Sequence, residues 1–475
     1  MTEPGNEDDA EAILSYLDEA RSERARFCAM GRFSEADEAV LRALRHVLSV
    51  ASPNITGPDL GNLVYVAGRP RPGAPRTLYV PRQPVPAKRL TATCALMLVN
   101  RGCEPKTAVD MADGALFSYK WDDMGTFWYA VTTMVYAGEA DLARAHLERA
   151  VAHSGWLASP VPYSLLTVLR GRAAALRGEP AAARQLFESV LERGAVPQFA
   201  EVTVAWAVAA LVDLGDIDSA STLLRVHRFD RNLDNVVDRA EVFAARGGLY
   251  QALGRSQLAY EDYLACGREL TGLGVTNPAV IAWRSQAALC AAAMGRLTLA
   301  FSLAQEELVQ ARRWGVPQTV GTALRAVAHL AEEGRDVELL REAIGLLRKN
   351  QSGAKSVLMR AQYELGVKLS FRGQSEEGRA ALRESLDTAI SIGSKVWADR
   401  VDDAIRRWAV ASAVEKLTVR EAKVANLAKA GSGNKEIAAH LKLANSTVEF
   451  HLSNVYRKLG ISGRDELRSI MVPLL

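Results

Sequence analysis

Residues 417–461 read LTVREAKVANLAKAGSGNKEIAAHLKLANSTVEFHLSNVYRKLGI. This pattern predicts three short helices separated by two tight turns. Around the last helix, apolar side chains fall within about 60° of arc, and mostly polar side chains lie on the opposite side. The apolar stripe is Val448, Leu452, Val455 and Leu459, and the opposite side carries Ser446, Glu449, Phe450, Ser453 and Arg457. A helix with one buried stripe and one polar face suits insertion into a DNA groove.

Local signals around this helix favour the same arrangement. Thr418 and Glu421 are spaced as a capping box, which predicts the start of the first helix, and Gly431 is placed to end it. The second helix is expected at residues 434–441. After Gly460, a fourth segment carries apolar residues at helical spacing, namely Leu467, Ile470, Met471 and Leu474.

These residues strongly resemble the C-terminal DNA-binding domain of the LuxR family of bacterial transcription regulators. The matching segments are Leu417-Thr418-x-Arg420-Glu421, Asn434-Lys435-Glu436-Ile437-Ala438, Thr447-Val448-x-x-His451-Leu452 and Tyr456-Arg457-Lys458-Leu459-Gly460-Ile461, followed by Arg464. The resemblance implies base-facing positions at Glu449, Phe450 and Ser453. It also implies phosphate contacts at Lys435, Thr447, Arg457 and Lys458. Ser446 is the remaining residue expected to contact DNA. Because the last helix of such domains pairs two copies, a dimer seam is expected at Leu467, Ile470 and Met471.

The segment departs from the family pattern at three positions. Ala444 and Gly433 replace small hydroxyl residues that cap helices, and alanine is a poor cap whereas glycine costs only a few tenths of a kcal/mol. Ser446 stands where many relatives place Arg or Lys. An alternative capping box between Ser446 and Glu449 would start the recognition helix later and divert Glu449 from the groove.

The positive charge of the chain is concentrated at its end. Residues 415–475 contain 10 Lys and Arg and 6 Asp and Glu, a net charge of +4, whereas the remaining 414 residues contain 48 and 49. The excess therefore lies where a polyanion would contact the protein. Because the excess is small, binding is expected to rely on dimerisation and to weaken steeply with salt.

Composition limits the class of protein. A length of 475 residues allows two or three domains, and 49% of the residues are hydrophobic, as in an ordinary soluble protein. No apolar run approaches the ~20 residues of a membrane span. The first nine residues are polar and acidic and show no secretion signal. Five scattered cysteines without a CxxC pair favour reduced thiols and argue against zinc. We therefore expect a cytoplasmic protein without a metal, a cofactor or a membrane partner.

A repeat organises the middle of the chain. A glycine followed five residues later by an alanine recurs at spacings between 37 and 41 residues, in the pairs Gly138/Ala143, Gly178/Ala183, Gly215/Ala220, Gly254/Ala259 and Gly295/Ala300. Each repeat has room for two helices of about 15 residues. The repeat predicts an all-α fold, an α-solenoid of helical hairpins similar to tetratricopeptide (TPR) repeats.

One stretch interrupts the helical pattern. Residues 51–88 contain 8 of the 17 prolines, interleaved with arginines, and cannot be helical throughout. The stretch is either a loop along the solenoid edge or an exposed interaction segment. The expected organisation is a helical hairpin at 1–50, an irregular segment at 51–90, repeats at 91–408, a linker at 409–416 and the DNA-binding domain at 417–475.

Residues from about 100 to 410 also look like the C-terminal half of the large ATP-binding regulators of the LuxR family. The matching segments are Tyr263-Leu-Ala-Cys-Gly267, Asn277-Pro-Ala with Trp283-Arg284-Ser285, and Arg312-Arg313-Trp314-Gly315 with Pro317. The resemblance implies an effector or oligomerisation role for the repeats. The chain contains no GxxxxGK[ST] motif, so the ATPase of those regulators is not carried over.

The repeats show no catalytic pattern. His153, His227 and His329 are far apart in sequence and have no acid or nucleophile at motif spacing, so no catalytic residue is expected. A cluster of aromatic residues offers a candidate ligand wall, with packing between hairpins as the alternative. Its candidate contacts are Tyr119, Trp121 and Trp128.

These observations predict a DNA-binding transcription regulator that is not an enzyme. Its repeats would sense a small-molecule or peptide effector and control a helix-turn-helix that binds double-stranded promoter DNA as a homodimer, with RNA polymerase as a further candidate partner. The alternative is a helical-repeat protein-binding scaffold with a weak or auxiliary DNA-binding domain.

Overall fold

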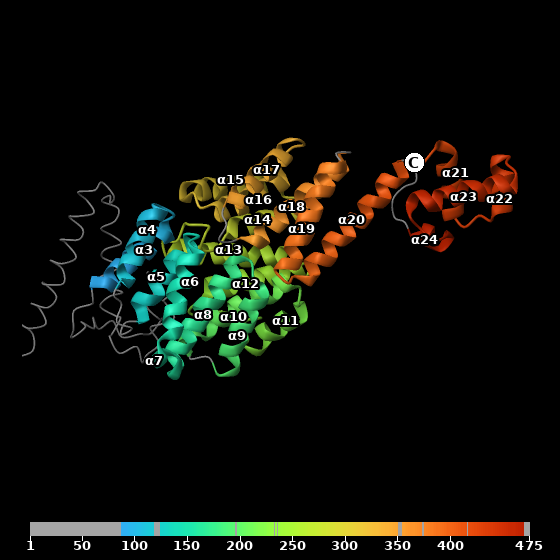
Figure 1. Ribbon diagram of the computed structural model, residues 1–475. Helices are drawn as coiled ribbons and strands as arrows, with labels where there is room; N and C mark the ends of the chain where they lie inside the picture. The colour runs from blue at the N-terminus through green and yellow to red at the C-terminus, as the bar shows by residue number, and fades with distance from the viewer. Residues whose placement is uncertain are drawn as a thin grey trace, which may run out of the picture. The chain divides into compact units, whose positions relative to one another are not determined.

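The computed structural model of the protein describes residues 87–117, 124–194, 197–231, 233–234, 236–349, 354–372, 375–415 and 417–469. Every regular element in these ranges is a helix, as Figure 1 shows, which confirms the all-α fold. The hairpin expected at 1–50 lies outside the described residues, as does most of the irregular segment expected at 51–90. The first described helix begins at Ala87, inside the range expected to be irregular.

Helices follow one another as hairpins through the repeat region, with α7 as a short addition (Figure 1). The helices of this region are α3 (Ala87–Arg101), α4 (Pro105–Leu116), α5 (Met124–Tyr136), α6 (Ala140–Ala152), α7 (Ser154–Ala158), α8 (Pro160–Arg177), α9 (Pro180–Glu192), α10 (Pro197–Leu214), α11 (Ile217–Val226), α12 (Arg239–Ala252), α13 (Ser256–Gly272), α14 (Trp283–Ala293), α15 (Leu297–Trp314), α16 (Pro317–Leu330), α17 (Arg335–Lys349), α18 (Lys355–Phe371), α19 (Ser375–Ser391) and α20 (Lys395–Glu415).

The glycine–alanine repeat corresponds to the turns of these hairpins. All five glycines adopt positive φ, between 72° and 83°, a conformation that glycine reaches without steric strain. Each partner alanine is fully buried in the following helix. A small side chain at that position lets the two helices of a hairpin approach closely. The sequence repeat therefore marks the structural repeat.

Small residues also set the helix crossings inside hairpins. A Cβ atom at Gly171 in α8 would collide with the ring of Phe187 in α9, and a Cβ at Gly321 in α16 would lie 2.9 Å from Leu347 Cγ in α17. Phe187 and Leu347 are themselves buried. In these two hairpins, a large apolar side chain therefore packs against the bare backbone of a glycine in the partner helix.

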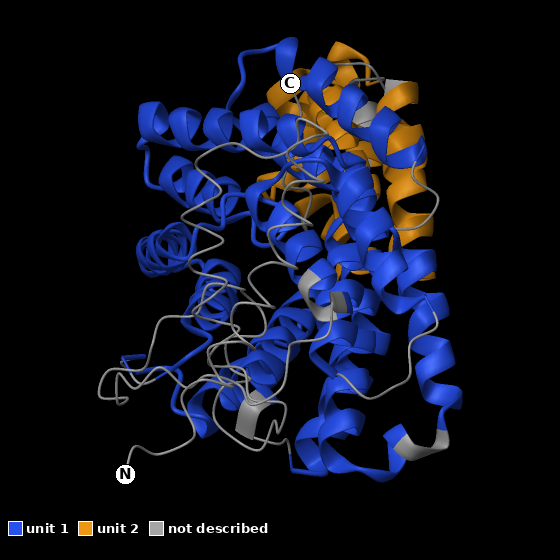
Figure 2. Cartoon of the chain, turned by 90° about the vertical axis from the view of Figure 1, so that its left-hand side faces the viewer, with its two compact units in different colours: residues 1–361, 392–394 blue, residues 362–391, 395–475 orange. Residues whose placement is uncertain are grey.

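Contacts divide the chain into two compact units, which Figure 2 shows in different colours. Unit 1 comprises residues 1–361 and 392–394, and unit 2 comprises residues 362–391 and 395–475. Most of the linker expected at 409–416 is helical, because α20 ends only at Glu415.

Within unit 1, residues about 178 positions apart contact one another. Asn277 Nδ2 donates to the carbonyl oxygen of Val99 at 2.6 Å, and Trp314 Nε1 donates to that of Tyr136 at 3.3 Å. Arg360 pairs in the same way with Asp213, 147 positions away. Successive turns of the solenoid in unit 1 are therefore joined by hydrogen bonds and an ion pair, in addition to the packing between neighbouring hairpins.

Candidate nucleic-acid interface

The C-terminal domain contains the three helices expected from its sequence and a fourth. They are α21 (Val419–Lys429), α22 (Asn434–Leu441), α23 (Asn445–Leu459) and α24 (Arg464–Ser469). The bounds of α22 are those predicted. The N-cap of α23 is Ala444, which forms no side-chain cap hydrogen bond. The alternative in which α23 starts later, at a Ser446–Glu449 capping box, is therefore wrong.

The two predicted faces of α23 are present in the structure. Val448, Leu452, Val455 and Leu459 are buried in a core formed with α21, α22 and α24. The side chains predicted on the opposite face are all exposed: Ser446, Glu449, Phe450, Ser453 and Arg457. This core fixes the helix so that a continuous strip of side chains faces outward.

A buried carboxylate joins the start of α21 to the end of α23. Glu421 Oε2 accepts a hydrogen bond from the backbone N–H of Thr418 at 2.7 Å, and Glu421 N–H donates to Thr418 Oγ1 at 3.3 Å. These two bonds confirm the predicted capping box. The same carboxylate oxygen accepts a hydrogen bond from Lys458 Nζ at 2.6 Å.

The environment of Glu421 keeps this carboxylate ionised. Burial acts to raise its pKa, but the hydrogen bonds from Lys458 and Thr418 outweigh burial, so the pKa of Glu421 lies below its ordinary value. Lys458, expected to contact phosphate, thus forms an ion pair inside the domain. The two residues are 37 positions apart, so sequence spacing gave no signal of the pair.

Arg464 fixes α24 against the turn between α21 and α22. Its guanidinium donates to the carbonyl oxygen of Ser432 at 2.7 Å and to Asn434 Oδ1 at 2.6 Å. The same turn is capped by Glu436, whose carboxylate accepts the backbone N–H of Gly433 at 2.7 Å. These bonds hold the start of α22 relative to α24, and they explain why the matched motif includes an arginine at 464.

Side chains on the outer face of α23 also interact with one another. Asn445 Nδ2 donates to Glu449 Oε1 at 3.0 Å, one helical turn away, and Arg457 donates to Asn454 Oδ1 at 3.3 Å. Asn445 was not among the residues expected at the interface, although its i,i+4 spacing from Glu449 is a readable signal. Lys435 is exposed at the start of α22, and Thr447 is half-buried.

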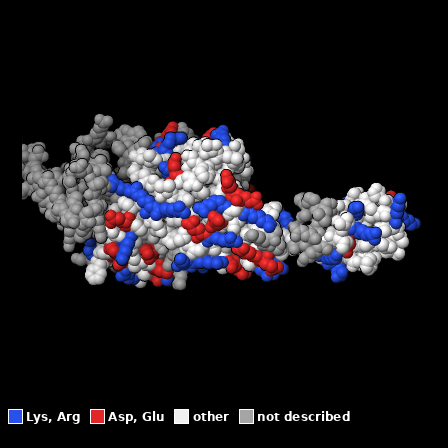
Figure 3. Space-filling model, turned by 90° about the horizontal axis from the view of Figure 1, so that it is seen from above, with Lys and Arg blue, Asp and Glu red and all other residues white. Residues whose placement is uncertain are grey.

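The C-terminal domain shows mostly positive side chains on the face drawn in Figure 3. On the face in Figure 3, the charged side chains of the lobe that contains α21–α24 are mainly Lys and Arg, whereas the repeat region shows both signs together. This distribution agrees with the net charge of +4 in residues 415–475.

Of the three residues expected at a dimer seam, one lies in the described part of the chain. Leu467 is fully buried in the apolar core of its own domain, and its helix α24 packs against α21. Its side chain therefore stabilises the domain internally. Ile470 and Met471 lie outside the described residues.

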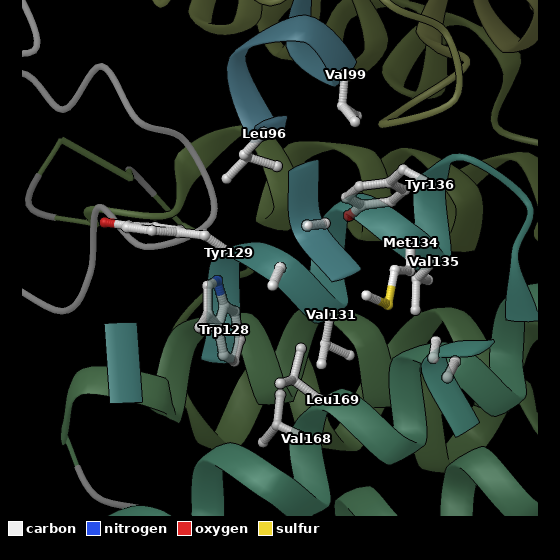
Figure 4. Packing of buried hydrophobic residues seen from close by; sticks show 14 of the residues in the cluster. Leu96, Val99, Trp128, Tyr129, Val131, Met134, Val135, Tyr136, Val168 and Leu169 are labelled. Atoms are coloured by element: carbon white, nitrogen blue, oxygen red, sulfur yellow. The ribbon is translucent and has the colours of Figure 1, made fainter. Parts of the chain in front are cut away.

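Of the three residues of the candidate ligand wall, Trp128 lies in the described part of the chain, and it belongs to the core. Trp128 has no exposed surface and stacks on Phe199 and Trp206, with ring centroids 5.4 Å and 6.4 Å away, and Figure 4 shows it among packed apolar side chains. Tyr119 and Trp121 lie outside the described residues. The stacking favours the packing alternative for Trp128.

The described residues contain neither a metal-binding cluster nor a membrane-spanning helix. No group of three or more His, Cys, Asp or Glu side chains in that part of the chain is arranged to hold a metal ion. Among the same residues, no helix combines the length and the apolarity that crossing a membrane requires.

Comparison with known proteins identifies the C-terminal domain. The family described as bacterial regulatory proteins, luxR family, matches residues 415–471. The nitrate/nitrite response regulator protein NarP of Escherichia coli (strain K12) is 37% identical over 76 residues, which are 15% of this chain and 35% of that protein. The chain thus matches about a third of the length of this relative. The LuxR resemblance expected from the motifs is confirmed.

The solved structures that match this chain are distant in sequence. The crystal structure of the APC/C hetero-tetramer Cut9–Hcn1 contains a chain that is 13% identical, with a TM-score of 0.44, over 80% of this chain and 64% of that chain. A Rap protein complexed with competence and sporulation factor is 10% identical, with a TM-score of 0.39, over 78% and 98%.

Proposed function

We propose, since residues 415–471 are a DNA-binding domain of the luxR family, that this protein regulates transcription by placing α23 in the major groove of promoter DNA. The observation that carries the proposal is the outward strip of α23, which is exposed along its length and supported by a buried apolar stripe on the other side. Its short polar side chains and single ring fit between groove walls.

Phosphate contacts come from the positive side chains that have no strong partner within the domain. Arg457 and Lys435 are exposed and belong to this class, whereas Lys458 is held by Glu421. Thr447 and Ser446, at the start of α23, donate hydrogen bonds from their hydroxyl groups to phosphates of the DNA backbone. DNA binding releases counterions, so the affinity falls as salt rises.

The repeats supply the regulatory part of the proposal. The helical hairpins of unit 1 form the surface on which a small-molecule or peptide effector acts, and α20 continues to Glu415, directly before the DNA-binding domain. The effector changes the availability of this domain or its dimerisation through Ile470 and Met471. The protein acts in the bacterial cytoplasm, and RNA polymerase is a partner at the promoter.

The test is selection of bound duplexes from random oligonucleotides by the full chain at a stated salt concentration. We expect enrichment of two inverted half-sites about one helical turn apart, as a dimer requires. Variants Arg457→Ala and Lys435→Ala should weaken binding to all sequences to a similar degree. A protein that enriches no sequence and shifts no duplex at low salt would exclude the proposal.

A second function is favoured by exposed apolar side chains on α15. Leu297, Phe301 and Val309 are 64%, 47% and 64% exposed, and at 100° per residue they fall within about 120° of arc around the helix. Such a strip suits a protein-binding scaffold with an auxiliary DNA-binding domain. A partner that co-purifies in stoichiometric amount with the wild type, and not with Phe301→Ser, would support this alternative.

A further inference from the structure

The outward face of α23 carries two neighbouring side chains with unlike chemistry. Glu449 is an exposed carboxylate, and Phe450 is an apolar ring that is 64% exposed. In residues 417–469, the other exposed large apolar side chain is Val419, which lies on α21. The ring of Phe450 lies in a T-shaped arrangement with that of the neighbouring His451, with centroids 5.9 Å apart.

Moving a solvent-exposed phenyl ring from water onto an apolar surface lowers the free energy. In the major groove, the apolar group that base edges offer is the 5-methyl of thymine, since the other groups there are hydrogen-bond donors and acceptors. Phe450 is therefore suited to a thymine, and it gains nothing from a base that lacks the methyl group.

Glu449 selects by a different rule. An ionised carboxylate only accepts hydrogen bonds, so it pairs with the exocyclic amine of cytosine or adenine and is repelled by the acceptors of guanine and by thymine O4. Asn445 donates to Oε1 of this carboxylate and thereby orients it along the helix. This hydrogen bond uses Oε1 and leaves Oε2 of the exposed carboxylate as the acceptor for a base amine.

The two residues read the same base pair or adjacent ones. Neighbouring helical residues are separated by a rise of about 1.5 Å along the axis, which is less than the ~3.4 Å between successive base pairs. We propose that each half-site contains a thymine whose methyl contacts Phe450 and, on the same or the next base pair, a cytosine or adenine amine that donates to Glu449. This inference rests on the proposed function.

The first test removes single methyl groups from DNA. The full chain is titrated with its selected duplex and with duplexes in which one thymine at a time is replaced by deoxyuridine. At one position per half-site, loss of the methyl should weaken wild-type binding by about fourfold, the value of one buried methyl group. Phe450→Ala should bind the thymine and deoxyuridine duplexes equally, and Val419→Ala should keep the wild-type difference. Phe450→Leu, which retains apolar contact, should keep part of it.

The second test changes the carboxylate. Because a glutamine side chain both donates and accepts, Glu449→Gln should admit guanine or thymine at the position where the wild type selects only cytosine or adenine. Equal wild-type affinity for every thymine and deoxyuridine duplex would overturn the thymine contact, and an unchanged preference in Glu449→Gln would overturn the amine contact. A wild-type protein that binds no duplex would instead contradict the proposed function, so the two failures are distinct.

Discussion

At the scale of single residues, the neighbours Arg457 and Lys458 have different surroundings. Arg457 is exposed and donates to Asn454 on its own helix, whereas Lys458 is partly buried and pairs with Glu421. Both were expected at the DNA from the resemblance. The distinction arises because one helical step turns a side chain by 100°, from the outward strip of α23 toward α21.

This difference predicts separate effects of two alanine variants. Arg457→Ala should reduce the slope of log affinity against log salt by about 1, since one phosphate contact is lost. Lys458→Ala should leave that slope unchanged and destabilise the domain by about 1–3 kcal/mol, because Glu421 loses a charged donor while buried. The checks are DNA titrations at several salt concentrations and thermal unfolding. An equal loss of slope in both variants would show that Lys458 leaves Glu421 to bind DNA.

Glu307 is a buried carboxyl group whose titration affects the stability of the fold. The carboxyl group is fully buried and accepts backbone hydrogen bonds from Arg284 and Ser285, both at 3.0 Å. Burial raises the pKa of Glu307 to about 7, and the hydrogen bonds only partly oppose this rise. Because the folded pKa exceeds the ordinary value, the folded state retains a proton that the unfolded chain loses between about pH 4.5 and 7. Stability from this group therefore falls as pH rises through that window.

The variant Glu307→Gln removes this titration. The free energy of unfolding of this variant, minus that of the wild type, should rise by about 3 kcal/mol between about pH 4.5 and 7.5. A pH-independent difference between the two proteins does not affect this rise. Urea unfolding at several pH values measures the difference. A difference that does not change with pH would mean that the carboxyl group titrates normally in the folded protein.

At the scale of elements, α23 begins without a side-chain cap. Ala444 has the extended backbone of an N-cap, with φ −76° and ψ 149°, but no side-chain oxygen to accept an N–H of the first turn. Helix bounds in this domain followed from local spacing, because capping residues and apolar periodicity lie within one or two turns. Contacts between elements, such as Lys458 with Glu421, depend on packing and were not readable from spacing.

A serine at this cap should stabilise the domain. Ala444→Ser supplies the missing acceptor and should raise the free energy of unfolding by about 1 kcal/mol, visible as a higher melting temperature of the C-terminal domain. Gly433→Ser is the matched comparison at the start of α22, and it should gain only a few tenths of a kcal/mol because glycine is a tolerable cap. A larger gain at 433 than at 444 would contradict this view of the two caps.

At the scale of the whole molecule, the sequence repeat predicts hairpins but not how far-apart hairpins meet. The turn glycines and buried alanines gave the period, because each repeat satisfies its own backbone and packing needs. The contact of Asn277 with Val99 joins residues 178 positions apart and depends on the curvature accumulated over several repeats. The curvature of the solenoid is the sum of small rotations between successive repeats, and no single sequence motif predicts it.

The most direct test of DNA docking by α23 is photo-cross-linking from the full chain. A benzophenone-bearing amino acid is placed at position 450 on α23 or, as a control, at position 419 on α21, and each protein is irradiated with its selected duplex. We predict cross-links to base edges from position 450 and none above background from position 419. Absence of a cross-link from position 450, with binding intact, would contradict the placement of α23 in the groove.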